Sequence, residues 1–160
     1  MSLTFHPLSL ERQTEYKRRL KKTPQISSDY SFVNIWSWRD IYDLEWAWTD
    51  SLVFIRQNSP QVQYWAPIGP WQDHDWAAEL GDLPSGLCLT RIPSQLSEIL
   101  TQQLPQRAHL HPAPEHFDYL YDVQELIELR GNRFHKKKNL LNQFKRSYNF
   151  TYIPLTLEAV

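Results

Sequence analysis

Basic side chains crowd one short stretch near the carboxyl end of the sequence. They are Arg130, Arg133, Lys136, Lys137, Lys138, Lys145 and Arg146. The whole chain carries a formal net charge of −1, so any attraction to a polyanion must come from a local patch. Ammonium and guanidinium groups gathered in this way are suited to bind phosphate.

The basic residues are expected where a helix begins. Asp122 and Glu125 form a capping pair that predicts a short helix over 123–129, and Gly131 fits the left-handed residue that would end it. A second helix then begins near Asn132, with cations in the first turns, where the helix dipole disfavours them. Because an anion would relieve this conflict, the pattern predicts a phosphate site. The alternative is the solvated face of an amphipathic helix.

A second candidate contact lies in the segment 28–39. Asp29 or Ser28 is expected to cap a short helix that buries Phe32, Ile35 and Trp36. Arg39 would then complement the carboxyl end of that helix, or bind an anion or carboxylate in bidentate fashion. We predict Asp29, Tyr30 and Arg39 as this second contact.

Proton-transfer and metal chemistry are poorly supported. His135 could act as a general base or donate to phosphate, and Tyr148 is nearby, but spacing gives neither a partner, so catalytic residues stay unassigned. Three histidines lie close in sequence, at 109, 111 and 116, but the prolines among them break any helical ligand spacing, and we predict no metal site. His74, between two aspartates, is interpreted as a solvated residue of a helix cap.

Size and composition predict one cytoplasmic domain. The 160 residues suffice for one core, to which 7 tryptophans contribute much of the apolar volume. The single cysteine, Cys88, lies in an apolar context typical of a buried strand and excludes a disulfide within the chain, which favours a reducing compartment. The sequence shows neither a signal peptide nor an apolar run of membrane-spanning length.

Hydrophobic periodicity predicts a mixed sheet with helices packed on it. A period near four predicts a helix over 10–20, and alternation predicts three antiparallel strands within 42–66. Further helices are expected over 76–80 and 94–103. Further strands are expected at 87–91, 108–110, 117–121 and 148–154. The basic segment would therefore follow a strand directly, and the fold class is α+β, that is, mixed α/β.

Two stretches, 28–39 and 126–144, carry a specific likeness, which segments 64–69 and 117–121 support. They resemble an uncharacterised bacterial family that is grouped with the C-terminal domain of phosphatidylglycerol lysyltransferase. The resemblance implies an acyltransferase-like (GNAT) fold with a mostly antiparallel mixed sheet and helices on both faces. It also implies two copies in tandem, so that residues 1–160 would be a single domain, the N-terminal half, ending where a second copy should begin.

The resemblance further implies a function for the basic helix. In the acyltransferase fold, the helix after a central strand turns its beginning toward the phosphates of the donor. Relatives move an aminoacyl group from aminoacyl-tRNA to a lipid, so acyl-CoA (with coenzyme A as the bound moiety) or aminoacyl-tRNA would be the donor. The implied donor-binding residues are Gly131, Asn132, Arg133, His135, Lys136, Lys137, Asn139 and Asn142. The sequence lacks the Gly-x-Gly loop of ordinary acetyl-CoA users.

Other functions fit the same residues. The domain could be non-catalytic, holding RNA on the basic patch or supporting a second acyltransferase domain. In a purely structural domain, Glu125 and Glu128 would cover the basic patch. An acyl- or aminoacyl-transferase-like domain is the function we predict first.

Overall fold

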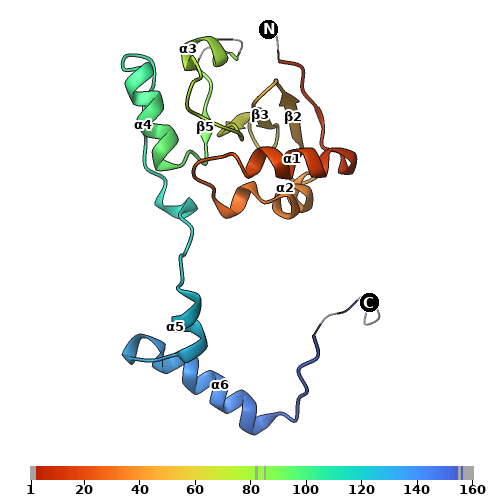
Figure 1. The fold of residues 1–160 in the computed structure, drawn as a ribbon, viewed down its shortest axis with the longest axis vertical. Coiled ribbons are helices and arrows are strands. Elements are labelled where there is room, and N and C mark those ends of the chain that lie inside the picture. The colour runs from red at the N-terminus through yellow and green to blue at the C-terminus, as the bar shows by residue number, and fades with distance from the viewer. Residues whose placement is uncertain (1–2, 82, 85, 155, 157–160) are drawn as a thin grey trace. The chain divides into compact units, whose positions relative to one another are not determined.

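The computed structural model describes residues 3–81, 83–84, 86–154 and 156. It divides into two compact units, Met1–Asp118 and Tyr119–Val160, named here the N-terminal and C-terminal units (Figure 1). The expected boundary with a second copy, near 155–160, falls largely outside the described residues.

A five-stranded mixed sheet organises the N-terminal unit. The strands are β1 (His6–Pro7), β2 (Leu44–Trp48), β3 (Val53–Gln57), β4 (Gln63–Trp65) and β5 (Leu89–Thr90), and they lie in that order across the sheet. The pairings from β1 to β4 are antiparallel, and β4 pairs with β5 in parallel. The predicted three-stranded antiparallel arrangement within 42–66 is therefore confirmed, as is the α+β class, and the sheet is consistent with the expected acyltransferase-like fold.

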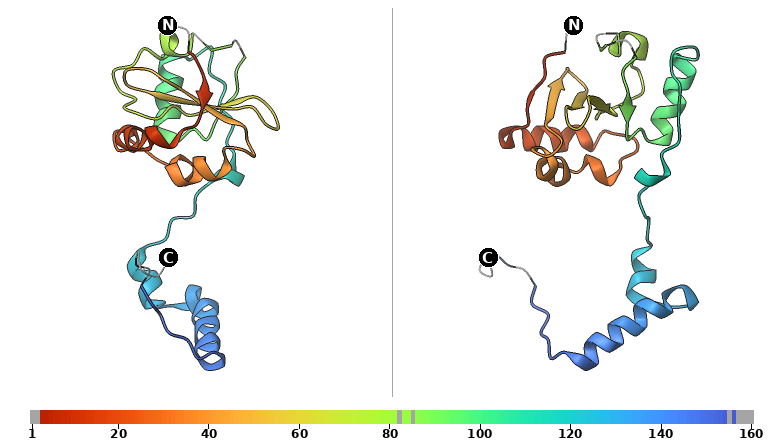
Figure 2. Two further views of the ribbon diagram at one scale, coloured as in Figure 1. Left: turned by 90° about the vertical axis from the view of Figure 1, so that its right-hand side faces the viewer. Right: turned by 180° about the vertical axis from the view of Figure 1, so that it is seen from behind.

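Helices of the N-terminal unit pack on this sheet. They are α1 (Gln13–Leu20), preceded by a 3₁₀ turn at Leu10–Arg12, α2 (Phe32–Trp38), preceded by a 3₁₀ turn at Ser28–Tyr30, α3 (Trp76–Glu79) and α4 (Ser94–Gln103). A further 3₁₀ turn spans Pro114–His116. The rings of Tyr16 in α1 and Phe32 in α2 contact Trp46 of β2, which places both helices over one face of the sheet. Figure 2 shows α1 and α2 side by side in both views.

Local capping chemistry explains where two of these helices begin. Of the two aspartates beside His74, Asp75 caps α3: its carboxylate accepts hydrogen bonds from the backbone N–H groups of Ala77 and Ala78. The expected cap of α2 was wrong. Ser31, rather than Asp29 or Ser28, accepts from the N–H of Asn34 at 3.2 Å, because the preceding residues turn into a 3₁₀ segment first.

The strands expected at 108–110, 117–121 and 148–154 do not form. A strand is stable only when its backbone pairs with a neighbour, and the described part of these segments pairs with none. Their side chains are correspondingly open to solvent, with Tyr119 86% and Tyr152 85% exposed. Cys88 is also exposed rather than buried, because it precedes a two-residue strand at the edge of the sheet.

The C-terminal unit consists of helices with little core. It contains α5 (Val123–Glu128), a 3₁₀ turn at Asn132–Phe134 and α6 (His135–Ser147). Asp122 caps α5 as predicted, accepting from the Glu125 N–H at 2.9 Å. The left-handed residue that ends α5 is Leu129, with φ 48°, and the prediction of Gly131 for that role was wrong. Gly131 instead opens the next turn with φ 84°.

None of the helices in the described part of the chain combines the length and apolar character that a membrane crossing needs.

Candidate functional site

The two arginines that open the basic segment are already engaged by acids of α5. Arg133 forms an ion pair with Glu125, and the Arg130 Nε lies 3.1 Å from a carboxylate oxygen of Glu128. Acidic side chains that cover a basic patch would pair with it in this way, but the two ion pairs neutralise only Arg130 and Arg133. The Arg133 guanidinium also lies 4.9 Å from the ring centre of Phe134, the buried residue of the 3₁₀ turn at Asn132–Phe134.

Positive charge remains at the first turns of α6. Lys136, Lys137 and Lys138 are all exposed, and none forms an ion pair with another residue in the described part of the chain. The Lys137 ammonium lies 5.5 Å from the ring centre of Tyr121, which orients it without neutralising it. The lysines are therefore the cations at this helix end that an incoming anion could pair with.

A shallow hollow of about 350 Å³ runs along α6 beyond the lysines. It is lined by Asn139, Asn142, Gln143, Arg146 and Ser147. These residues recur at spacings of three and four, so they share one face of the helix. Asn139 and Asn142 belong to the predicted donor site, whereas the last three were missed. Counting steps of three and four residues along the helix from Asn139 would have predicted them.

The remaining predicted donor residues lie at the start of the same segment. Gly131, Asn132 and His135 are exposed, and His135 is the first residue of α6. A Cβ added at Gly131 would meet nothing within 4 Å, so this position requires glycine for its positive φ rather than for close packing. No hydrogen bond joins His135 or Tyr148 to another described side chain, so the geometry does not assign a general base here.

The second predicted contact is only partly assembled. Asp29 faces Arg91, whose Nε lies 3.0 Å from a carboxylate oxygen, and Tyr30 donates its hydroxyl hydrogen to the Arg91 carbonyl. The Nε of Arg91 has no hydrogen-bond partner among the described residues, so the contact with Asp29 is an ion pair. Burial, with the Asp29 charge adding to it, raises the pKa of the Tyr30 hydroxyl far above its ordinary value.

Arg39 lies apart from this cluster. Its guanidinium donates to the carbonyl of Trp36, stacks 4.0 Å from the Trp36 ring centre and pairs with Asp40 at 3.0 Å. The residue that pairs with Asp29 is Arg91, which the sequence prediction did not include. Arg91 is 62 positions from Asp29 in the sequence. Its guanidinium lies 4.0 Å from the ring centre of Trp65.

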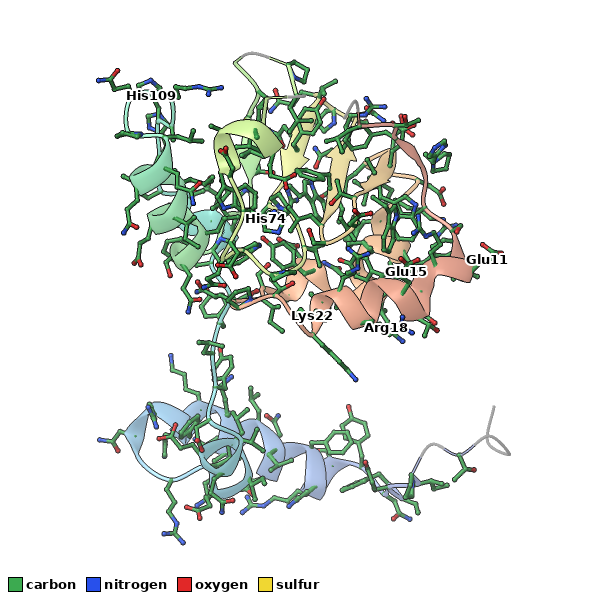
Figure 3. The ribbon with its side chains drawn as sticks, turned by 45° about the horizontal axis from the view of Figure 1, so that its top comes forward. Glu11, Glu15, Arg18, Lys22, His74 and His109 are labelled. Atoms are coloured by element: carbon green, nitrogen blue, oxygen red, sulfur yellow. The ribbon has the colours of Figure 1, made fainter. Side chains whose placement is uncertain are left out.

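His74 is not the solvated residue that its neighbours suggested. Its side chain is only 13% exposed, and both ring nitrogens are engaged, with Glu79 at 2.7 Å and with Ser51 at 3.2 Å. Figure 3 labels it. Among residues 3–81, 83–84, 86–154 and 156, no three histidine, cysteine, aspartate or glutamate side chains lie close enough together to hold a metal ion.

Comparisons with known proteins relate the chain to a transferase domain. The family model described as "Phosphatidylglycerol lysyltransferase, C-terminal" matches residues 20–159. No curated protein matches the chain.

One solved structure is similar over nearly the whole chain. It is the crystal structure of a conserved protein of unknown function from Bacteroides thetaiotaomicron VPI-5482, with 26% sequence identity and a TM-score of 0.78. The match covers 91% of this chain and 51% of that one, so the chain spans about half the length of this relative.

Proposed function

The chain belongs to the phosphatidylglycerol lysyltransferase C-terminal family, and we propose that it is an acyl- or aminoacyl-transferase domain that holds a phosphate-bearing donor on α6. The donor class is an acyl-CoA or an aminoacyl-tRNA, which share phosphate as the group recognised. The observation that supports this proposal is the group of exposed lysines at the beginning of α6, which form no ion pair with any described residue. The hollow lies further along the same helix.

The proposal divides the work among the residues of the segment. Lys136 and Lys137 would pair with phosphate, since Arg133 is held by Glu125. The free N–H groups at the beginning of the helical segment would add hydrogen bonds. Asn139 and Asn142 would orient the donor with their amides, and Arg146 would extend the positive surface along the hollow. Gly131 sets the turn that starts the segment.

The test is binding of coenzyme A and of deacylated tRNA to residues 1–160, by calorimetry and fluorescence anisotropy. Replacing Lys136 and Lys137 by alanine removes two phosphate contacts, so the slope of log K against log salt for tRNA should become shallower by about 1.4–1.8. A response to tRNA alone identifies that donor, and a response to coenzyme A alone identifies the other. Folded protein that binds neither ligand contradicts the proposal.

A matched comparison comes from α1. Lys21 and Lys22 are also adjacent and exposed at one end of a helix, and a second hollow, of about 320 Å³, is lined by Thr14, Lys17, Arg18 and Lys21. Replacing Lys21 and Lys22 by alanine changes the net charge as much as the α6 variant does. If the α1 pair weakens binding and the α6 pair does not, the site has been assigned to the wrong helix.

A second candidate function is a half-domain that supports a second acyltransferase domain. Apolar side chains at Leu140, Leu141 and Phe144 of α6, and at Val123 and Ile127 of α5, are exposed by 41–70%. An exposed apolar surface of this kind is typical of an interface. The match covers 51% of the chain of the solved relative, so about half of that chain lies outside the match.

The half-domain function is tested with a hydrophobic dye. If the apolar face awaits a partner, residues 1–160 should enhance the fluorescence of anilinonaphthalene sulfonate, and the double variant Leu140→Gln, Phe144→Gln should lose most of that enhancement. Dye binding without any binding of tRNA or coenzyme A would favour this function over donor binding. A wild-type chain without dye enhancement would contradict it.

A further inference from the structure

Three polar side chains from separate parts of the N-terminal unit form a linear hydrogen-bonded chain. Ser51 lies in the turn between β2 and β3, His74 precedes α3, and Glu79 ends α3. The Ser51 Oγ lies 3.2 Å from the His74 Nε2, and the His74 Nδ1 lies 2.7 Å from the Glu79 Oε1. The order is nucleophile, imidazole and carboxylate, the arrangement that activates a serine.

The carboxylate fixes which nitrogen of the imidazole holds the proton. An ionised Glu79 can only accept hydrogen bonds, so the Nδ1 of His74 must donate to it. In the neutral ring, the lone pair then lies on Nε2, directed at the Ser51 hydroxyl. Glu79 thereby sets the tautomer that a general base needs, and the side chain of His74, only 13% exposed, is kept in place against the ring of the buried Trp76.

The backbone around Ser51 is rigid on both sides. The turn is closed by a bond from the Thr49 N–H to the Leu52 carbonyl, and the Leu52 N–H donates to the Thr49 hydroxyl. Gly69 approaches so closely that a Cβ there would lie 2.4 Å from the Ser51 carbonyl oxygen. Ser51 itself is half-buried, and its neighbour Asp50 is exposed. The hydroxyl is thus held on a rigid turn at the surface.

We propose that Ser51, His74 and Glu79 form a serine-nucleophile centre that cleaves activated esters. The Ser51 Oγ forms a bond to the ester carbonyl carbon while its proton passes to the Nε2 of His74. The bond to the alcohol then breaks, and the alcohol leaves with that proton. Water attacks the acyl-serine, gives its proton to Nε2, and releases the acid as Ser51 recovers its hydrogen. This centre is independent of donor binding on α6.

The experiment uses a fluorescent fluorophosphonate on residues 1–160, in which the serine oxygen displaces fluoride from phosphorus. The wild-type chain should be labelled at Ser51, as located by peptide mass spectrometry. Ser51→Ala should abolish labelling, and His74→Gln should slow it by about 10²–10⁴-fold, the usual contribution of a general base. Hydrolysis of p-nitrophenyl acetate should fall in the same variants.

Two further variants separate catalysis from structure. Glu79→Gln keeps the size of the side chain but removes the charge that fixes the tautomer, and it should slow labelling while circular dichroism stays unchanged. Ser97→Ala removes a serine whose hydroxyl donates to the Ser94 carbonyl of its own helix, and labelling should persist. Folded wild-type protein labelled no faster than Ser51→Ala, or labelled at another serine, overturns the proposal and leaves the three residues a structural contact.

Discussion

The two units of the molecule are stabilised by different physics. The N-terminal unit buries large side chains completely, among them Trp46, Trp65, Trp71 and Trp76. In the described part of the C-terminal unit, Phe134 is the one buried hydrophobic residue. The helices of that unit are instead defined by local interactions, such as the Asp122 cap and the Arg133–Glu125 ion pair.

Under the proposed function, this difference separates a scaffold from the unit that would bind the donor. A cooperative core resists local opening, whereas helices held by caps and surface ion pairs open easily. A ligand that binds only the folded form of such helices would then contribute a large share of their stability. The C-terminal unit carries the lysines that pair with no acid among the described residues, and it also carries the exposed apolar side chains of α5 and α6. The proposed ligand or second domain would therefore bind the unit with the smaller core.

The largest difference in stability is expected between truncation of a buried side chain in the N-terminal unit and truncation of an exposed one in the C-terminal unit. Trp65 is 1% exposed and its indole N–H donates to Gln57, so Trp65→Ala should lower the free energy of unfolding by about 3–5 kcal/mol. Phe144 is 44% exposed, and Phe144→Ala should change global stability by less than about 0.5 kcal/mol. Urea unfolding followed by fluorescence measures both. Equal losses would mean that the two units share one core.

Replacing one glycine in each unit by alanine should give a smaller difference in stability between the units. Gly69→Ala combines a φ of 136° with a clash against the Ser51 backbone, and should cost at least about 1–3 kcal/mol. Gly131→Ala meets no neighbouring atom, so only its φ of 84° opposes the change. Its loss should be smaller and confined to hydrogen exchange around residues 129–135. A global loss at Gly131 would contradict the separation of the units.

Removal of either helix cap should cost a similar free energy. Removal of one should destabilise the whole N-terminal unit, whereas removal of the other should affect only its own helix. Asp75→Ala and Asp122→Ala each remove a carboxylate cap worth about 1 kcal/mol. The first should lower the midpoint of global unfolding, because α3 carries the buried Trp76. The second should speed amide exchange in α5 alone. Exchange mass spectrometry distinguishes these outcomes, and a global effect of Asp122→Ala would contradict them.

The smallest predicted effect is a dependence of stability on pH in the N-terminal unit. Hydrogen bonds from Asn58 and Arg56 hold the pKa of Glu45 below its ordinary value. A folded-state pKa below the unfolded one stabilises the fold above the unfolded pKa, about 4.3, and this contribution is lost as pH falls through the folded value. Glu45→Gln should therefore make unfolding below pH 4.5 less sensitive to acid. An unchanged profile would show that Glu45 contributes nothing.

Features encoded by neighbouring residues could be predicted from the sequence. The hairpins of β2 to β4 follow from alternation and turn residues, and the cap of α5 follows from Asp122. For α3 the sequence offers the two aspartates beside His74, and the structure uses Asp75. The strands expected at 117–121 and 148–154 did not form, because β-type composition does not supply the pairing partner that a strand requires. Composition described those side chains correctly as apolar, but it could not say what covers them.

Contacts between distant segments could not be predicted. The Asp29–Arg91 pair joins positions 62 apart, and the chain of Ser51, His74 and Glu79 joins a turn to a helix. The pairing of Arg133 with Glu125 is one of the alternatives that the sequence leaves open. Sequence could not decide it, because side-chain rotamers on two short helices determine which cation an acid reaches.

In the proposed function, the beginning of α6 receives a phosphate-bearing donor. Hydrogen-exchange mass spectrometry of residues 1–160, with and without saturating deacylated tRNA or coenzyme A, tests it most directly. The account predicts slower exchange over 130–147 with at least one ligand, unchanged exchange in β2 and β3, and loss of the protection when Lys136 and Lys137 are alanine. Exchange unchanged over 130–147 with both ligands, or protection that survives the double variant, would contradict it.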